Sequence, residues 1–143
     1  VVDEDGTHAG AGSQEVHIVN PPLPAPATPL GLDAIADDLG NITLDWTIGD
    51  STNLSGYIVE ESDDGVNFTD VTSVAASATS MVLADTPEDQ TIYFKVVGFN
   101  EVLYSDESGI VSAVAALRAP TSLSAHDATS SGLTLNWLDN SDA

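Results

Sequence analysis

Residues 41–48 read NITLDWTI, and their pattern of apolar and polar side chains indicates the fold class. Polar residues separate four apolar side chains, Ile42, Leu44, Trp46 and Ile48. This alternation is typical of a β-strand with one buried face. Further short runs of apolar and polar residues, separated by turn residues, follow at 56–62, 68–74, 80–84, 91–100 and 109–117. We therefore expect an all-β, immunoglobulin-like antiparallel β-sandwich with essentially no helix.

The same stretch recurs near the end of the chain. Trp137 lies 91 positions after Trp46, and from Pro29 onward an ungapped alignment at this offset gives five further identities: Pro29 with Pro120, Leu32 with Leu123, Ala34 with Ala125, Thr43 with Thr134 and Leu44 with Leu135. An offset of 91 residues is close to the roughly 100 residues of an immunoglobulin-like module. The second copy stops after its first two strands, so we expect a fragment of a longer protein with tandem repeats.

A proline-rich stretch divides the chain before the first copy. Residues 20–29, NPPLPAPATP, contain five prolines, and proline removes backbone donors and fixes φ, so we expect an extended linker there. The sequence predicts four segments. They are the C-terminal hairpin of a preceding β module at 1–19, the linker at 20–29, one complete domain at 30–117 and the truncated start of a second domain at 118–143.

The residues of the central segment resemble a fibronectin type III domain. The resemblance rests on Pro29 with Leu32 and Ala34, on LDW at 44–46, on SGYIVEESDDGVNF at 55–68, on FKVVGFN at 94–100 and on SDESGIV at 105–111. Residues 118–143 resemble the first quarter of another such domain, of a kind common in bacterial secreted proteins. Residues 1–19 are similar to the end of a PKD-type, immunoglobulin-like module. The resemblance implies a two-sheet sandwich that serves as a module of a larger protein.

One position departs from the family pattern. The family usually has a tyrosine eight residues before the asparagine that ends strand 91–100, and Ile92 stands there. Because Lys95 is expected to face water, alternation predicts that Tyr93 and Val97 also face outward. The expected structural core consists of Leu32, Leu44, Trp46, Tyr57, Val59, Ile92, Phe94 and Val96.

The charge balance excludes two classes of partner. The chain has 23 acidic residues against Lys95 and Arg118 alone, for a net charge of −21. Such a surface repels nucleic acid and anionic lipid, and no apolar run approaches the roughly 20 residues of a membrane span. We therefore expect no nucleic-acid binding and no membrane insertion. Three explanations for the acidity stay open: a surface suited to salt water, calcium-dependent assembly, and self-repulsion that keeps a long chain dispersed.

The residues offer no arrangement for catalysis. The three histidines, His8, His17 and His126, all lie outside the complete domain, and the chain has no cysteine. A hydroxyl or thiol nucleophile needs a base held against it, so we predict no enzyme activity, no catalytic residues and no cofactor. For a metal, the candidates are Asp3 and Asp5 of DEDG at 3–6, which begin like a calcium loop but lack its later ligands.

Two further sequence features have a structural and a functional interpretation. The acidic run ESDDGVNF at 61–68 could be an ion loop, but its place between two predicted strands favours a hairpin turn, with Gly65 in the left-handed conformation. Three glycosylation motifs begin at Asn41, Asn53 and Asn67. All three lie at predicted turns or strand edges, where a glycan has room.

These observations predict a non-catalytic module. We expect it to space or present neighbouring domains of a larger secreted or cell-surface protein, with protein-mediated adhesion as an extension of that role. The expected partners are neighbouring domains of the same chain, and also other surface proteins or glycans. Two alternatives remain: an accessory region of an extracellular hydrolase, acting on polysaccharide or another substrate, whose catalytic domain lies elsewhere, and a calcium-stiffened adhesin segment.

The charge of the chain predicts how its stability responds to ions. Added NaCl screens like charges, so we expect the melting temperature measured by calorimetry to rise from low to high salt. Millimolar calcium should raise it beyond a control of matched ionic strength only if a specific site exists, since a bound ligand stabilises by mass action. An unchanged melting temperature from low to high salt would contradict the screening argument.

Overall fold

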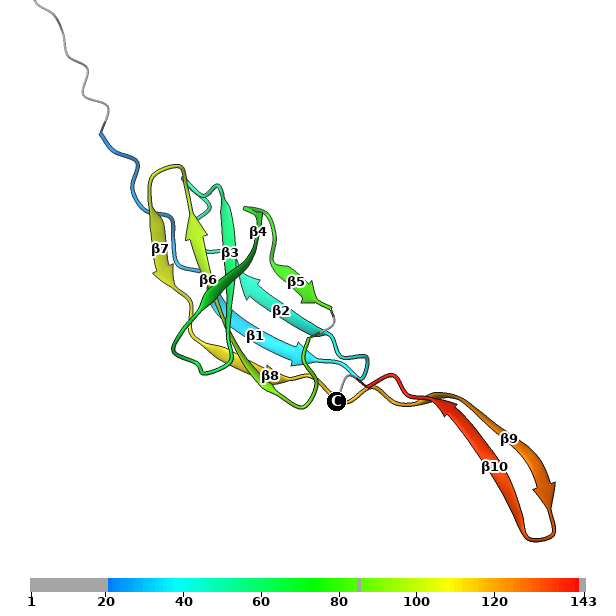
Figure 1. Cartoon of the computed structure of the whole chain (residues 1–143). Coiled ribbons are helices and arrows are strands. Elements are labelled where there is room, and N and C mark those ends of the chain that lie inside the picture. Colours follow the sequence, from blue (N-terminus) through cyan, green and yellow to red (C-terminus); the bar gives the residue numbers. More distant parts are fainter. Residues whose placement is uncertain (1–20, 85, 142–143) are drawn as a thin grey trace, which may run out of the picture.

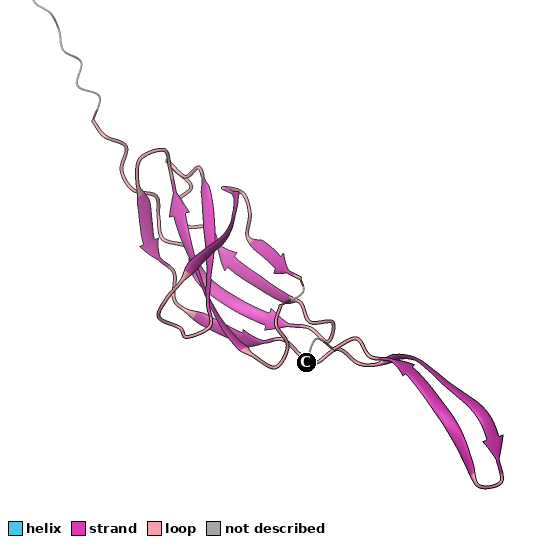
Figure 2. Ribbon diagram, viewed as in Figure 1, coloured by secondary structure: helices cyan, strands magenta, loops and turns pink. Residues whose placement is uncertain are grey.

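The computed structural model describes residues 21–84 and 86–141, which contain ten strands and no helix (Figure 2). The strands are β1 (Leu30–Ala36), β2 (Ile42–Thr47), β3 (Gly56–Ser62), β4 (Thr69–Ala75), β5 (Ser80–Leu83), β6 (Thr91–Phe99), β7 (Tyr104–Glu107), β8 (Val111–Val114), β9 (Thr121–Thr129) and β10 (Gly132–Leu138). The described part of the chain has no helix that could cross a membrane. The hairpin predicted at 1–19 lies outside the described residues.

The first eight strands form two antiparallel sheets packed face to face (Figure 1). One sheet has the order β1-β2-β5, and the other has the order β4-β3-β6-β7, with β8 also paired to β6. Strands β7 and β8 lie along successive parts of β6, and Ser108 stands between them. Its hydroxyl accepts the Val96 N–H at 2.9 Å, and its own N–H donates to Val96 O at 2.9 Å. The Ser108 hydroxyl thus accepts the Val96 N–H where a backbone carbonyl of a paired strand would otherwise accept it.

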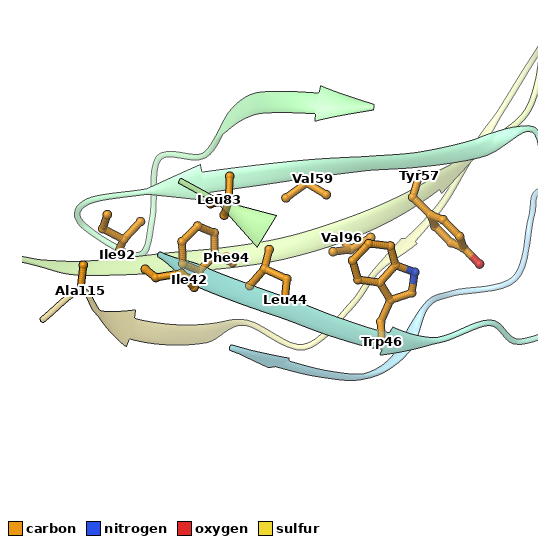
Figure 3. Close-up of a cluster of buried hydrophobic side chains, with 10 residues drawn as sticks. All are labelled: Ile42, Leu44, Trp46, Tyr57, Val59, Leu83, Ile92, Phe94, Val96 and Ala115. Carbon is orange, nitrogen blue, oxygen red and sulfur yellow. The ribbon is translucent and has the colours of Figure 1, made fainter. Parts of the chain in front are cut away.

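The core lies between the two sheets, where the inward-facing side chains meet (Figure 3). Trp46 on β2 and Tyr57 on β3 pack edge to face, with ring centroids 5.7 Å apart. The buried cluster consists of Ile42, Leu44, Trp46, Tyr57, Val59, Leu83, Ile92, Phe94, Val96 and Ala115. Seven of the eight core residues named from the sequence belong to this cluster, and Leu32 packs against it partly buried. Ile92 points inward, and the Tyr93 ring lies beside Gly65 of the turn after β3.

The proline-rich stretch packs on the sandwich over part of its length. Residues 21–29 form no strand, but Pro26 and Pro29 are buried. The Asn100 side-chain amide donates to Pro24 O at 3.0 Å, and its carbonyl accepts the N–H groups of Val102 and Leu103. Asn100 therefore ties the stretch to the turn between β6 and β7. The second half of the expected linker is in contact with the domain rather than free of it.

Strands β9 and β10 repeat four of the five residue pairs of β1 and β2. The pair of Ala36 with Ile42 has no counterpart, because the register of the second hairpin shifts between Gly132 and Thr134. Ala34 stands opposite Leu44 in the first hairpin, and Ala125 stands opposite Leu135 in the second. The neighbouring pairs agree as well. Asp33 with Asp45 corresponds to Ser124 with Asn136, Ile35 with Thr43 corresponds to His126 with Thr134, and Leu30 with Thr47 corresponds to Thr121 with Leu138. The 91-residue repeat is thus a repeat of backbone register as well as of sequence.

Both hairpins also carry the same irregularity. The register shifts between Leu30 and Asp33 in β1, and again between the corresponding pairs in β9. Gly31 has φ +61° in the first bulge, and Ser122, which is 91 positions later, has φ +58° in the second. Glycine adopts this left-handed conformation freely, whereas serine adopts it at a cost. The bulge is therefore a property of the repeated hairpin, since it is present with or without glycine.

The two hairpins differ in what covers their apolar face. Leu44 and Trp46 are 0% and 3% exposed, because β3 and β6 cover them. Their counterparts Leu135 and Trp137 are 50% and 58% exposed. Within the described residues β9 and β10 pair with each other alone. The second hairpin thus presents an uncovered apolar face.

This difference predicts that the same substitution has a large effect on stability in the first copy and a small one in the second. Leu44→Ala should destabilise the sandwich by about 2–5 kcal/mol, because it leaves a cavity between two packed sheets. Leu135→Ala is the matched control and should change stability by less than about 0.5 kcal/mol, since its side chain packs against little. Urea unfolding followed by tryptophan fluorescence measures both. Equal losses for the two variants would contradict this account of the core.

Candidate functional site

A charged cluster covers the outer face of the sheet that contains β3, β6 and β7. Lys95 on β6 stands opposite Glu60 on β3, and its Nζ lies 2.9 Å from Glu60 Oε2. The same Nζ lies 2.5 Å from Glu107 Oε1 on β7 and 4.6 Å from the centroid of the Phe68 ring. Two carboxylates and an aromatic face therefore surround one ammonium group, each partner coming from a different segment.

The expectation that Lys95 faces water is wrong. Its side chain projects from the outer face of the sheet, as alternation predicted, but the residue is only 8% exposed because Glu60, Glu107 and Phe68 surround it. Burial by itself would lower the pKa of Lys95, but the hydrogen bonds to Glu107 and Glu60 outweigh this effect and raise the pKa above its ordinary value. Lys95 is therefore charged at neutral pH, and it is the cation of a structural ion pair rather than a base.

A shallow hollow of about 310 Å³ lies beside this cluster. It is lined by Ile58, Glu60, Asp70, Val97, Tyr104, Ser105 and Glu107. Tyr104 is exposed, and Val97 is buried although its side chain also faces outward. The hollow combines an apolar floor with carboxylates at its rim. A single exposed ring on this face could contact a partner, but the hollow has no enclosed volume in which a substrate could be desolvated.

The acidic run at 61–68 covers the end of β3 and the turn that leads to β4. The carboxylate of Asp64 in this turn is hydrogen-bonded to neighbouring residues of the chain. Asp64 accepts the N–H groups of Val66 and Asn67 at 2.8 and 2.7 Å, the Asn67 side-chain amide at 2.6 Å and the Ser62 hydroxyl at 2.8 Å. These bonds, led by those from Asn67, hold the pKa of Asp64 well below its ordinary value. Gly65 has φ +71°, as expected for the turn. The hydrogen bonds of Asp64 and the conformation of Gly65 explain these two residues without an ion.

The described residues hold no group of three or more histidine, cysteine, aspartate or glutamate side chains that could bind a metal ion. The predicted candidates Asp3 and Asp5 lie outside the described residues, as do His8 and His17. His126 lies on β9, where its Nε2 is 3.0 Å from Ser124 Oγ. No pattern in the sequence indicates this contact. It joins two residues on one exposed face of the hairpin, and no described carboxylate is hydrogen-bonded to the imidazole.

The three predicted glycosylation sites differ in how their side-chain amides are held. Asn41 Nδ2 donates to Asp37 Oδ2 at 2.9 Å, and Asn67 Nδ2 donates to Asp64 Oδ2 at 2.6 Å. Both amides therefore hold turns together. Asn53 lies in a turn between β2 and β3 with φ +62°. Glycosylation at these positions stays a prediction.

Comparison with solved structures identifies the fold of the sandwich. No family model and no curated protein matches the sequence. The structure is similar to the chicken CNTN1 FN1-FN3 domains, with TM-score 0.58, 14% identity and coverage of 64% of this chain and 31% of that chain. An Fn3-like protein from Clostridium thermocellum matches with TM-score 0.55 and 21% identity over 62% of this chain and 92% of that one. A beta-1,2-glucanase from Parabacteroides distasonis matches with TM-score 0.54 and 21% identity over 64% of this chain but only 12% of its own.

The sandwich of β1 to β8 thus has the fold of a fibronectin type III domain, as the sequence resemblance indicated. This fold occurs within multidomain proteins. The resemblance is one of architecture, and it names no ligand or reaction for this chain. The arrangement of the described residues must therefore supply any functional argument.

The Lys95 cluster predicts a specific loss of stability. Lys95→Met keeps most of the side-chain volume but leaves the partly buried Glu60 without its cation, so we expect a loss of about 1–3 kcal/mol in the free energy of unfolding. The double variant Lys95→Met with Glu60→Gln should recover part of this loss, because the amide carries no charge. Urea unfolding at pH 7 measures the three proteins. If Lys95→Met were as stable as the parent, the cluster would not contribute to the stability of the fold.

Proposed function

We propose that this chain is a non-catalytic spacer and presentation module of a larger secreted or cell-surface protein. The observation that carries the proposal is the duplicated hairpin, in which the register and the bulge of β1 and β2 recur 91 residues later. A second hairpin with the same apolar positions is the beginning of a second sandwich of the same kind. Modules in series hold other domains at a distance, and this task needs no substrate pocket.

The described surfaces support a structural task more than a chemical one. The lysine on the sheet face is neutralised by two carboxylates, and the carboxylate in the β3–β4 turn is bound by its own backbone. The net charge of −21 favours solubility and mutual repulsion of successive modules. Protein-mediated adhesion would use the exposed Val102, Leu103 and Tyr104 after β6, which form an apolar tip beside the hollow.

One observation favours the second candidate, an accessory region of an extracellular hydrolase. The beta-1,2-glucanase from Parabacteroides distasonis contains a domain of this fold, and that domain occupies 12% of its chain. In this alternative the catalytic domain lies outside these residues. The calcium-stiffened adhesin stays a prediction, because Asp3 and Asp5 lie outside the described residues.

The proposal predicts the size and the location of the natural polypeptide. An antibody raised against residues 30–117 should detect, in culture medium or at the cell surface, a polypeptide several times larger than the 14.7 kDa of this chain. Immunoblots of separated medium, surface and cytosol fractions make the measurement, with a cytosolic protein and pre-immune serum as controls. A single band near 14.7 kDa in the cytosol would overturn the proposal. Polysaccharide hydrolysis by the immunoprecipitated polypeptide would favour the hydrolase alternative instead.

A further inference from the structure

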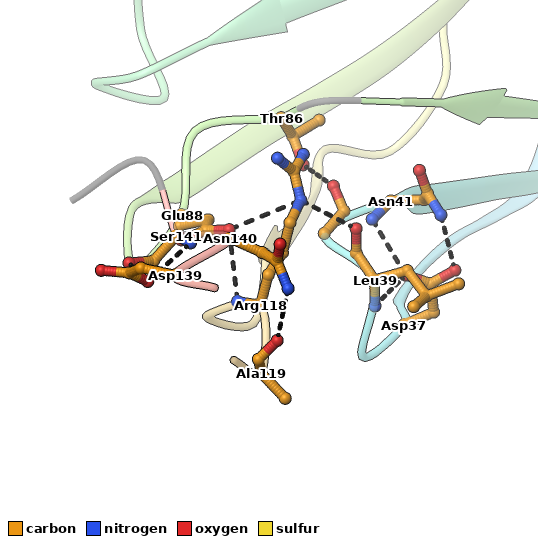
Figure 4. Close-up of polar contacts among 11 residues, drawn as sticks. Asp37, Leu39, Asn41, Thr86, Glu88, Arg118, Ala119, Asp139, Asn140 and Ser141 are labelled. Atoms are coloured by element: carbon orange, nitrogen blue, oxygen red, sulfur yellow. Dashed lines mark hydrogen bonds and ion pairs between the residues drawn. The ribbon is translucent and has the colours of Figure 1, made fainter. Parts of the chain in front are cut away.

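The connection between the sandwich and the second hairpin is held by the only arginine of the chain (Figure 4). Arg118 lies between β8 and β9. Its backbone N–H donates to Glu88 Oε1 at 3.2 Å, and its Nε–H donates to Leu39 O at 3.1 Å. Nε also lies 3.5 Å from Glu88 Oε1. One residue therefore joins the connection to the β1–β2 turn and to the segment before β6.

The partner of Arg118 is a buried carboxylate. The Glu88 side chain is 1% exposed, and Glu88 also pairs with Ala115 in a parallel bridge just before the connection. A buried carboxylate without a cation is strongly unfavourable. The burial of Glu88 thus holds the guanidinium in place, and with it the backbone at residue 118.

The backbone around Arg118 is shaped to admit its side chain. Gly40 has φ +79°, and a Cβ built at this position would stand 2.9 Å from Arg118 Nε. Gly40 O is in turn held by the Thr86 hydroxyl at 2.7 Å. A side chain at residue 40 would collide with the guanidinium and strain the turn. The β1–β2 turn, the segment at 86–88 and Arg118 therefore form one interlocked unit, which we call the Arg118 clamp.

A second clamp closes the base of the hairpin. Asn140, which follows β10, donates from Nδ2 to Ala119 O at 2.9 Å and to Thr121 Oγ1 at 3.1 Å. The two legs of the hairpin are thus bonded to each other immediately beyond the Arg118 clamp. Between the two clamps lie Ala119 and Pro120, and proline fixes its own φ. Few backbone rotations remain that could turn the hairpin relative to the sandwich.

These two clamps are additions to the repeat. In the first copy, the positions of Arg118 and Asn140 are occupied by Ala27 and Gly49, which have no polar side chain. The backbones approach each other in the same way there, since a Cβ built at Gly49 would lie 3.5 Å from Thr28 O. The side chains that form the polar contacts at the boundary before the second copy therefore have no polar counterpart at the same positions of the first copy.

We propose that Arg118 and Asn140 make the boundary between successive modules a stiff joint with a defined angle. This inference rests on the proposed spacer function and adds a mechanical property to it. Most acidic residues lie in the sandwich, and residues 118–143 carry three aspartates against Arg118, so charge repulsion alone would leave the mutual orientation of the two parts undefined. Arg118 fixes residue 118 to the sandwich through Glu88 and Leu39 O. Asn140 fixes the start of the hairpin through Ala119 O and Thr121 Oγ1. Together the two sets of contacts restrict the short segment between them to one orientation.

The test is a distance measurement across the joint. Because the chain has no cysteine, Ser73→Cys on β4 and Asn136→Cys on β10 allow two spin labels, and pulsed electron spin resonance gives the distribution of distances between them. We expect one narrow peak for the labelled parent chain and loss of that peak for Arg118→Ala. Arg118→Lys should restore it in part, because lysine keeps the charge but cannot make the same pair of bonds.

Two further variants keep the test decisive. Lys95→Met removes the other basic residue of the chain, far from the joint, and should keep the narrow peak. Asn140→Ala opens the base of the hairpin without touching the sandwich and should also lose the narrow peak, so it answers the question if Arg118→Ala does not fold. A broad distribution in the parent, or narrow peaks in both joint variants, would overturn the stiff joint. Neither result would bear on the size and location measured by immunoblot, which test the spacer function separately.

Discussion

The structure depends on the alternation of side chains along β2, which places Leu44 and Trp46 between the two sheets. A shift of one residue would turn both side chains to solvent and bring Asp45 and two threonines into the core. The edge-to-face contact of Trp46 with Tyr57 joins β2 to β3, and Phe94 and Val96 on β6 close the same space. These few side chains define how the sheets face each other, and every surface feature takes its position from that arrangement.

Each of the two strongly basic residues holds parts of the molecule together. Lys95 joins three segments on the outer face of one sheet, and Arg118 joins the β1–β2 turn to the connection that leads into β9. In a chain with 23 acidic residues, a basic side chain could pair with many different carboxylates. Burial makes the pairing specific, because water does not fully stabilise the carboxylates of Glu60 and Glu88. The ion pairs of the described residues therefore gather around Lys95 and Arg118.

Local patterns predicted much of the fold, and contacts between distant segments account for what they missed. The strand pattern identified the inward face of β2 and β6, and the Asp-Asp-Gly sequence identified the left-handed Gly65, because both depend on neighbours in the chain. Lys95 was placed on the correct face but given the wrong environment. Its burial depends on contacts with Glu60, Glu107 and Phe68, which lie far from it in the sequence. A local sequence pattern does not predict such contacts. The packing of Pro26 and Pro29 and the contacts of Arg118 were missed for the same reason.

The bulge shared by Gly31 and Ser122 has a consequence for how such modules behave side by side. Strand β1 lies at the edge of its sheet, where unpaired backbone groups could template the addition of a strand from another molecule. The register shift at Gly31 twists the start of this edge and interrupts its regular spacing of donors and acceptors. The same shift recurs at Ser122 and interrupts the start of β9 in the same way. A tandem array of such units would therefore lengthen end to end with less tendency to fuse laterally into fibres.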